Sequence, residues 1–595
     1  MPDKVAVRGG TLEQGLANGR ELIDQHPETA LTQARTLLKL GPDPRVLRLA
    51  ASAHRKLGES TEAEAAELAA IQQSLPIPRL KAAAQAEHEG RSGEASALAA
   101  QQLRQEPDDL LAMTISAEAA ISLRRLVEGE RLLRTVLERA PGFLRASMML
   151  ARSLTLQSRI SDAIAVLEDA VARVPNNVPA NKMLAQLRAE ARDFAGAAAG
   201  YERLVNQHDR EADLWVSYGD MLRFMGRRTD SELAYRRALV VDPASGLAWW
   251  SLSDLDPNAV TDKEVERMEA ALEQRASSLE DSGSLHFALG AVLDKRGRHA
   301  DAFTHFAEGN RLRQEAQPYD PAMLTGEVDR SIKLFTNQFY ASRSKAAVDD
   351  DSPIFIIGMP RSGSTLIERI LGQHSQIEAV GELPVIPRMV ESLSFKGGGI
   401  GKYRELLSQM PDAQVRDLGA MYLERAREFR KTDRRLFTDK LHMNWRHIGF
   451  IHLILPSAKI IDVRRGALDC CWSNYKLLFT RGHPAASSLD HIGRFYGDYV
   501  RMMDHMDRAQ PGSVLRVRYE EVVEDIERET HRMLDFLGAP FEQSCLDFHL
   551  SLEPLATASS EQVRRPLNRE GIGASGPYAQ WLSPLRDALG PLAGD

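Results

Sequence analysis

A strand-to-helix turn past the middle of the chain has the composition of a phosphate-binding loop. Residues 353–382 read PIFIIGMPRSGSTLIERILGQHSQIEAVGE. The apolar run 354–357 predicts a buried parallel strand and residues 365–371 have helical spacing, so residues 358–364 form the turn between them. Backbone N–H groups and the positive end of a helix bind phosphate, and Gly358 and Gly363 permit the tight turn. This pattern predicts an anion site, the alternative being an incidental glycine-rich turn.

The turn has the spacing of an ATP-binding loop but lacks one of its residues. The pattern G-x-x-x-x-G-K-[ST] places a lysine where this chain has Ser364, in G-M-P-R-S-G-S-T. An ordinary kinase or ATPase would therefore lack the cation that reaches its phosphates. A P-loop kinase stays as a disfavoured alternative.

The six residues Pro360, Arg361, Ser362, Gly363, Ser364 and Thr365 resemble the 5′-phosphosulfate loop of sulfotransferases that use 3′-phosphoadenylyl sulfate (PAPS). Gly381 and Glu382, with the run Val-Ile-Pro-Arg at 385–388 close behind, are similar to the segment of tyrosylprotein sulfotransferases that carries the glutamate base. The resemblance implies that the loop binds PAPS, that Arg361 also acts in catalysis, and that Glu382 is the general base.

A second block supports the same resemblance. Residues 459–475, KIIDVRRGALDCCWSNY, predict a strand over 459–463 and a helix that begins near Ala467. The resemblance implies that an arginine at the strand end and a serine eight residues later hold the ribose 3′-phosphate; Arg465 and Ser473 have this spacing. A guanidinium fork and a hydroxyl donor suit a dianionic phosphate.

Four further residues receive roles or alternatives from the resemblance. It assigns Lys440 to the leaving phosphate, although an Asp-Lys pair after a short strand is usually a solvated turn. His442 is a competing base, or a side chain that only packs or faces solvent. Tyr519 would flank the nucleotide or close a core. Arg565 would belong to a loop, matched at residues 559–566, that closes over the 3′-phosphate, and the three glycines of 568–577 suit a movable lid.

These roles together imply sulfuryl transfer from PAPS, as co-substrate, to a hydroxyl acceptor. Glu382 would remove the proton of the acceptor, while Arg361 and Lys440 would stabilise charge on the leaving phosphate. A phenol, with a pKa of about 10, is easier for a carboxylate base to deprotonate than an aliphatic alcohol is. This favours a tyrosine of a peptide or protein as acceptor. We expect no metal, because cationic side chains replace the magnesium of P-loop kinases.

The first half of the chain is a repeat array. Pro107, Pro141, Pro175 and Pro243 are 34, 34 and 68 residues apart. Residues 212–245 contain one unit, with a first helix, a break at Gly226 and a second helix before Pro243. The units resemble tetratricopeptide (TPR) repeats, which present a groove suited to a peptide or a protein partner. One position of each unit is small, where two helices must approach closely: Ala117, Ala151, Ala185 and Gly219.

We therefore predict a multidomain protein: an all-α TPR solenoid over residues 1–345, then an α/β, P-loop-like sulfotransferase domain with a parallel sheet over residues 346–595. The net charge is -8, about −7 of it in residues 1–350, which disfavours a nucleic-acid partner. Three cysteines suggest a reducing compartment, and no apolar run is long enough for a membrane anchor, so we expect a cytoplasmic location. A homodimer is a possible assembly.

Two alternatives for the function stay open at this point. One is a sulfotransferase of small molecules or glycans, because these hydroxyls use the same donor machinery. The other is a TPR interaction scaffold whose C-terminal domain is inactive. The presence of Arg361, Glu382, Lys440, Arg465 and Ser473 weighs against the scaffold.

Overall fold

The structure is a computed structural model that describes residues 11–273, 278–343, 347–396, 399, 402–479, 482–551 and 562–594. Its contacts divide the chain into two compact units, Met1–Ala191 and Arg192–Asp595. This division falls inside the repeat array. The boundary expected between residues 345 and 346 lies outside the described residues, so those domain limits remain a prediction.

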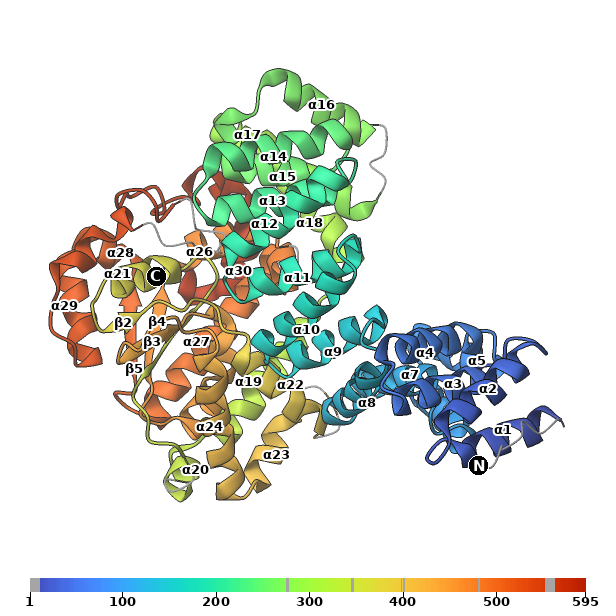
Figure 1. Cartoon of the computed structure of the whole chain (residues 1–595). Helices are drawn as coiled ribbons and strands as arrows, with labels where there is room; N and C mark the ends of the chain where they lie inside the picture. Colours follow the sequence, from blue (N-terminus) through green and yellow to red (C-terminus); the bar gives the residue numbers. More distant parts are fainter. Residues whose placement is uncertain are drawn as a thin grey trace. The chain divides into compact units, whose positions relative to one another are not determined.

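The first unit is built from helices that pack in consecutive pairs (Figure 1). The small positions Ala117, Ala151 and Ala185 are at most 1% exposed, as close helix packing requires. The helices are α1 (Leu12–Leu22), α2 (Pro27–Leu38), α3 (Pro44–Lys56), α4 (Ser60–Ser74), α5 (Pro78–His88), α6 (Ser92–Gln105), α7 (Leu110–Ser122), α8 (Leu126–Arg139), α9 (Leu144–Leu156), α10 (Ile160–Arg173) and α11 (Val178–Glu190). The expectation of an all-α repeat array is confirmed.

The repeat pattern continues in the second unit, where glycines meet aromatic rings. A β-carbon on Gly219 would lie 2.5 Å from Tyr235, and one on Gly290 would lie 2.6 Å from Phe306, so only glycine allows these helices to approach so closely. The helices are α12 (Phe194–Gln207), α13 (Ala212–Phe224), α14 (Arg228–Val241), α15 (Gly246–Leu255), η1 (Pro257–Ala259), α16 (Asp262–Glu273), α17 (Leu279–Lys295), α18 (His299–Ala316), α19 (Pro321–Leu334) and α20 (Asn337–Ser342).

The rest of the second unit contains a five-stranded parallel sheet in the order β2-β3-β1-β4-β5. The two strands expected from sequence, now β1 and β4, are central neighbours, with Gly358 opposite Val463. The parallel sheet is thus confirmed. The strands are β1 (Pro353–Gly358), β2 (Ile377–Glu378), β3 (Leu436–Asp439), β4 (Lys459–Arg464) and β5 (Val514–Arg518).

Helices cover both faces of the sheet, because alternate strand residues are buried on opposite sides. Ile354 and Ile356 join one hydrophobic core with side chains of α21 and α29. On the other face Phe355 meets Tyr422 of α24. The helices are α21 (Ser364–Gly372), α22 (Val385–Lys396), α23 (Tyr403–Gln409), α24 (Asp412–Arg427), η2 (His442–His447), α25 (Ile448–Ile454), α26 (Ala467–Tyr475), η3 (Pro484–Ser487), α27 (Leu489–Ala509), α28 (Tyr519–Glu524), α29 (Ile526–Leu537), η4 (Gln543–Leu550), η5 (Gly576–Trp581), α30 (Ser583–Leu589) and η6 (Gly590–Gly594).

Candidate active site

The predicted site residues follow the carboxyl ends of the strands. The phosphate-type loop follows β1, Glu382 follows β2, Lys440 follows β3, Arg465 follows β4 and Tyr519 follows β5. In open parallel sheets ligands bind at this edge, where the connections from two neighbouring strands leave in opposite directions. Here those neighbours are β1 and β4.

The β1–α21 loop has the backbone and the polar atoms of an anion cradle. Gly358, Arg361 and Gly363 have φ angles of 149°, 65° and 103°, so the chain turns sharply at each. In the part of the chain that the structure describes, no side chain caps the N-terminus of α21, which leaves its end to an incoming anion. The Ser362 hydroxyl is buried and has no hydrogen-bond partner among the described residues. A phosphate or sulfate oxygen would satisfy it.

The β4–α26 loop meets the first loop at Arg361. The Nε of Arg361 donates to Ser473 Oγ at 3.3 Å, and Arg465 Nη1 donates to the Arg361 carbonyl at 3.2 Å. Arg465 and Ser473 are 8% and 7% exposed. The Arg465 Nε is buried without a partner in the described part of the chain. The two motifs, about a hundred residues apart in sequence, therefore form one cationic, donor-rich site.

Electrostatics in this site favour a bound anion. Burial lowers the pKa of Arg361, and the positive charge of Arg465 lowers it further, while Asp254 of α15 acts in the opposite direction. Two guanidinium groups held together in a partly buried site repel one another. A phosphate between them would relieve that repulsion.

Tyr519 packs over the glycines of two loops. A β-carbon on Gly363 would lie 2.8 Å from its ring, and one on Gly571 would lie 2.8 Å from its hydroxyl. The Arg465 guanidinium lies over the same ring, 5.6 Å from its centre. Burial raises the pKa of Tyr519. The residue thus borders the predicted nucleotide site and also packs, so both of its expected roles are compatible with this position.

The C-terminal loop is only partly described. Residues 552–561, which include the predicted Ser559, Ser560 and Glu561, lie outside the described residues. Gln562 accepts from Arg361 Nη2 at 2.9 Å. Arg565 is exposed, and its backbone N–H donates to the Gln562 carbonyl at 3.3 Å. The segment 568–577 is tied down by Asp469, which accepts from the Gly573 and Ser575 amides.

Glu382 and Lys440, which follow β2 and β3 at the same edge of the sheet, form an ion pair. Lys440 Nζ lies 2.7 Å from Glu382 Oε1; the lysine side chain is 1% exposed and the glutamate side chain 37%. Burial raises the pKa of Glu382, but the charges of Lys440, His442 and Arg192 lower it by more, so the pKa falls below its ordinary value. Glu382 is ionised at neutral pH, as a base must be.

His442 lies next to the same carboxylate. Its Nδ1 is 4.0 Å from Glu382 Oε1. Burial lowers the pKa of His442, Glu382 raises it, and Lys440 lowers it further, with a net decrease. A neutral imidazole can accept a proton, so His442 stays a candidate base beside Glu382.

Two buried acids that the sequence interpretation missed hold this region in place. Glu368 of α21 accepts from the Gly381 N–H at 2.9 Å and from the Thr438 hydroxyl at 2.7 Å. Asp439 is fully buried, accepts from the Tyr422 hydroxyl at 3.0 Å, and has its pKa raised by burial to about 8. A lone acid within an apolar helix or strand is the signal that could have found both. The solvated turn considered for Asp439-Lys440 is not what forms, because both side chains are buried.

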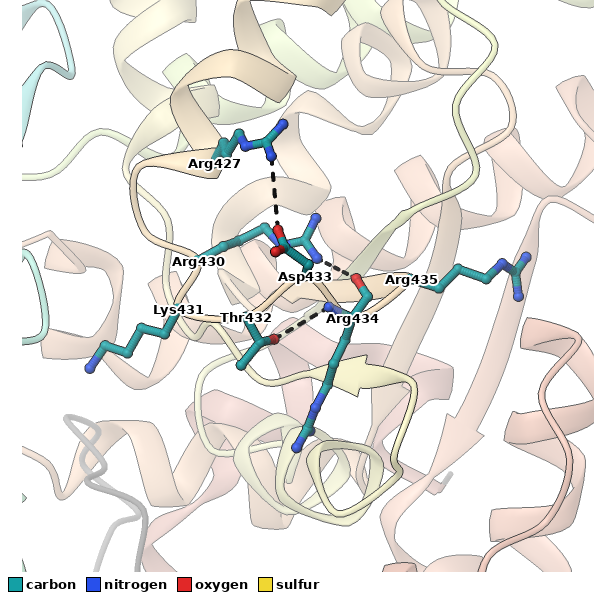
Figure 2. A pocket seen from close by; sticks show the side chains of 7 residues that line it. All are labelled: Arg427, Arg430, Lys431, Thr432, Asp433, Arg434 and Arg435. Carbon is teal, nitrogen blue, oxygen red and sulfur yellow. Dashed lines mark hydrogen bonds and ion pairs between the residues drawn. The ribbon is translucent and has the colours of Figure 1, made fainter.

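A basic pocket of about 390 Å³ lies elsewhere on the sheet, beside the loop that leads into β3 (Figure 2). Arg430 donates to Glu378, and Arg434 donates to the Ile377 carbonyl at 2.7 Å. Arg435 binds Asp351 at 2.6 Å. Arg430 and Arg434 thus hold the edge strand β2, and Arg435 holds the segment before β1, so we assign the pocket a structural role.

Comparisons with known proteins identify the families of both parts of the chain. A model of the sulfotransferase family matches residues 353–543, and a tetratricopeptide-repeat model matches residues 17–76 and 117–178. The chain therefore carries TPR repeats followed by a sulfotransferase-family domain. Within the described residues, no helix combines the length and apolar character needed to cross a membrane.

Three similar proteins illustrate the match. An uncharacterized protein of Aquifex aeolicus (strain VF5) is 28% identical over 376 residues, 62% of this chain and 49% of that protein. This chain thus spans about half the length of that relative. Protein-tyrosine sulfotransferase A of Caenorhabditis elegans is 23% identical over 261 residues, 41% of this chain and 66% of the relative. The sulfotransferase domain from the curacin biosynthetic pathway is 16% identical and covers 39% of this chain and 98% of its own, with a TM-score of 0.25.

Proposed function

We propose that the protein moves the sulfuryl group of PAPS to a hydroxyl acceptor. The observation that carries the proposal is the meeting of the β1–α21 and β4–α26 loops at Arg361, where Ser473 and Arg465 both contact it. One nucleotide with a phosphate at each end of its ribose could touch both loops. Ser362 Oγ and Arg465 Nε, which are buried and have no partner among the described residues, are donors that such a ligand would satisfy.

In the proposed reaction the acceptor oxygen attacks sulfur, and the bond from sulfur to the 5′-phosphate oxygen breaks. The products are a sulfate ester and adenosine 3′,5′-bisphosphate. The negative charge that develops on the leaving phosphate is stabilised by Arg361, Lys440 and the N–H groups that open α21. Such a reaction needs little covalent help, so positioning and charge supply most of the rate.

Glu382 takes the acceptor proton in this proposal. Its ionised carboxylate next to Lys440 supports the role, and a positioned base contributes roughly a hundred- to ten-thousand-fold. His442, which lies beside the same carboxylate, is the alternative base. A comparison of Glu382→Gln with His442→Gln would separate the two, since the base variant should lose far more turnover.

For the acceptor we favour a tyrosine of a peptide or protein bound with help from the TPR groove. A phenol suits a carboxylate base, and the name of the similar C. elegans protein points in the same direction. TPR repeats are surfaces for protein partners. Radiolabelled PAPS incubated with the protein and a lysate of its host would identify the acceptor, and label on a small molecule or glycan would contradict a tyrosine.

Substitutions in the transfer site provide the main test. We expect Arg361→Ala, Lys440→Ala and Glu382→Gln each to lower label transfer from PAPS by a hundredfold or more, because each removes charge or a proton acceptor. Circular dichroism and thermal unfolding should stay close to those of the wild type for Glu382→Gln. Wild-type transfer in all three variants would refute the proposal.

Nucleotide binding tests the second loop separately. Arg465→Ala and Ser473→Ala should weaken adenosine 3′,5′-bisphosphate much more than AMP, because AMP lacks the 3′-phosphate that these side chains would hold. Isothermal titration calorimetry measures both ligands on each variant. Equal losses for both nucleotides would mean that the 3′-phosphate binds elsewhere.

A further inference from the structure

Five successive repeats have a left-handed residue in the turn between their two helices. Gly90, Arg124, Ser158, Arg192 and Gly226 follow one another at intervals of 34 residues and have φ angles of 76°, 57°, 59°, 62° and 78°. Each lies between the first and the second helix of its repeat. Glycine adopts this conformation readily, whereas for another residue it costs about 1–2 kcal/mol of conformational free energy. A side chain kept at such a position suggests a function.

The side chain of Arg192, the first residue of the second unit, reaches the turn that carries Glu382. Gly381 has a φ of 88°, and a β-carbon placed on it would overlap the Arg192 guanidinium. Gly381 is also held by Glu368, and its carbonyl accepts from the Lys440 N–H at 2.8 Å. The cation of a repeat turn is thus packed on the glycine that precedes the proposed base.

Arg192 is itself held in place. Its carbonyl accepts from Lys431 Nζ at 3.4 Å, and its guanidinium lies over the Phe194 ring, 5.9 Å from the ring centre. Arg192 shares the electrostatic environment of Glu382 with Lys440 and His442, and the buried acid Asp439 faces the same region. Of these three residues around Glu382, Arg192 is the one that comes from the repeats.

We propose that Arg192 is a positioning residue of the active site: it packs on the Gly381-Glu382 turn and fixes the carboxylate toward the acceptor, so that a TPR turn completes the transferase. The inference rests on the proposed function, because it takes Glu382 as the base. Its charge also helps to keep that carboxylate ionised, since Arg192 acts to lower the pKa of Glu382.

Arg192→Gly is the decisive variant, because glycine is the residue that other repeats use at this position. Relief of the left-handed strain should leave the thermal unfolding temperature unchanged or higher. Label transfer from PAPS into the host lysate should fall about 10- to 100-fold in kcat/KM, as expected for a displaced catalytic group. The acidic limb of the pH–rate profile should move to higher pH, since loss of a positive charge raises the pKa of Glu382.

Arg124→Gly is the matched control, with the same backbone and the same substitution in the first unit. Arg124→Gly should leave the acidic limb of the pH–rate profile at its wild-type pH. Arg192→Lys should return the acidic limb to its wild-type pH, because the positive charge is restored. It should recover only part of the rate, because lysine lacks the planar guanidinium group. Affinity for adenosine 3′,5′-bisphosphate should be unchanged in all three variants.

Nuclear magnetic resonance gives a second readout that needs no acceptor. With isotope-labelled glutamate side chains, the signal lost in Glu382→Gln identifies Glu382, and its titration should move to higher pH in Arg192→Gly. An unmoved titration, or a rate loss without any movement of the limb, would overturn the proposal for Arg192. Full activity of Glu382→Gln would instead refute Glu382 as base, and with it the proposed mechanism.

Discussion

The repeats of the first unit and those of the second unit use the same 34-residue pattern in different ways. In the first unit, charged side chains pair with other repeats: Arg139 binds Glu67 at 2.6 Å, although 72 residues separate them. In the second unit, side chains of α18 donate hydrogen bonds to the sulfotransferase-family domain. The Asn310 amide donates to the Tyr475 carbonyl at 2.8 Å. Gln314 of the same helix donates to the Ser487 carbonyl at 2.6 Å.

Aromatic packing strengthens this difference. Phe303 of α18 stacks on Trp581 with ring centres 5.1 Å apart and also meets Trp472 at 6.1 Å. Trp472 is fully buried. The last repeats therefore pack into the core of the sulfotransferase-family domain. A shared repeat pattern does not define a shared role, and we expect a partner-binding groove in the first unit.

Truncation gives the strongest test of the different roles of the repeats in the two units. A chain of residues 192–595 should fold and bind adenosine 3′,5′-bisphosphate within about threefold of the full chain, because it keeps the whole second unit. A chain of residues 346–595 should be insoluble or unfolded, because it exposes the packing surface around Trp472. Circular dichroism and nucleotide titration measure both.

Nucleotide-dependent stability is the check on these truncations. Ligand at a hundred times its dissociation constant should raise the free energy of unfolding of the 192–595 chain by about 2.7 kcal/mol. A folded 346–595 chain with the same nucleotide affinity would show that the last repeats are dispensable, and the comparison would fail.

Phe303→Ala should destabilise the second unit by about 2–3 kcal/mol, somewhat less than full burial of a phenylalanine would imply. The matched control is Phe143→Ala, a half-buried phenylalanine of the first unit that packs on its core. The control variant should lower the temperature of the other unfolding transition, the one that does not respond to nucleotide. Differential scanning calorimetry with and without adenosine 3′,5′-bisphosphate assigns each transition, and identical effects on both would contradict the division.

Asn310→Ala should cost about 1–3 kcal/mol in the nucleotide-linked transition, since it removes a buried donor to the Tyr475 carbonyl. Asn181→Ala of α11 is the control, because its amide donates to two carbonyls at a partly exposed position. There we expect a change within about 0.5 kcal/mol. Urea titrations compare the two, and equal costs would argue against a special role of α18.

The pH dependence should differ between the units. The folded pKa of Asp439 is about 8 against 3.8 for a free aspartate, so the folded chain binds a proton that the unfolded chain lacks. The stability of the second unit therefore falls as pH rises toward 8, and Asp439→Asn should flatten that fall between pH 6 and 9, as read from thermal unfolding.

Asp43→Asn of the first unit is the control for this effect. Burial raises the pKa of Asp43, but hydrogen bonds and the charge of Arg45 lower it by more. Its contribution is therefore present at neutral pH and is lost only as pH falls through the folded pKa, well below 6. An unchanged slope in Asp439→Asn between pH 6 and 9 would show that this carboxyl is ionised in the folded state.

The amino-acid sequence by itself determined the repeat period, the strand-to-helix loops and the residue types of both phosphate motifs. These are local features, since glycine at 358 and 363, the apolar run before them and the 34-residue spacing depend only on near neighbours in the chain. The roles proposed for Glu382 and Lys440 came from a resemblance; the structure pairs the two side chains at 2.7 Å.

Only the tertiary structure decided which distant residues meet. Parallel pairing of β1 with β4 brings Arg465 and Ser473 to Arg361, and burial raises the pKa of Asp439 to about 8, where the sequence had left a solvated turn as one alternative. Arg192 reaches the Gly381 turn across 189 residues of chain. Contacts between segments so far apart depend on how whole elements pack, and no local pattern of residues specifies that packing.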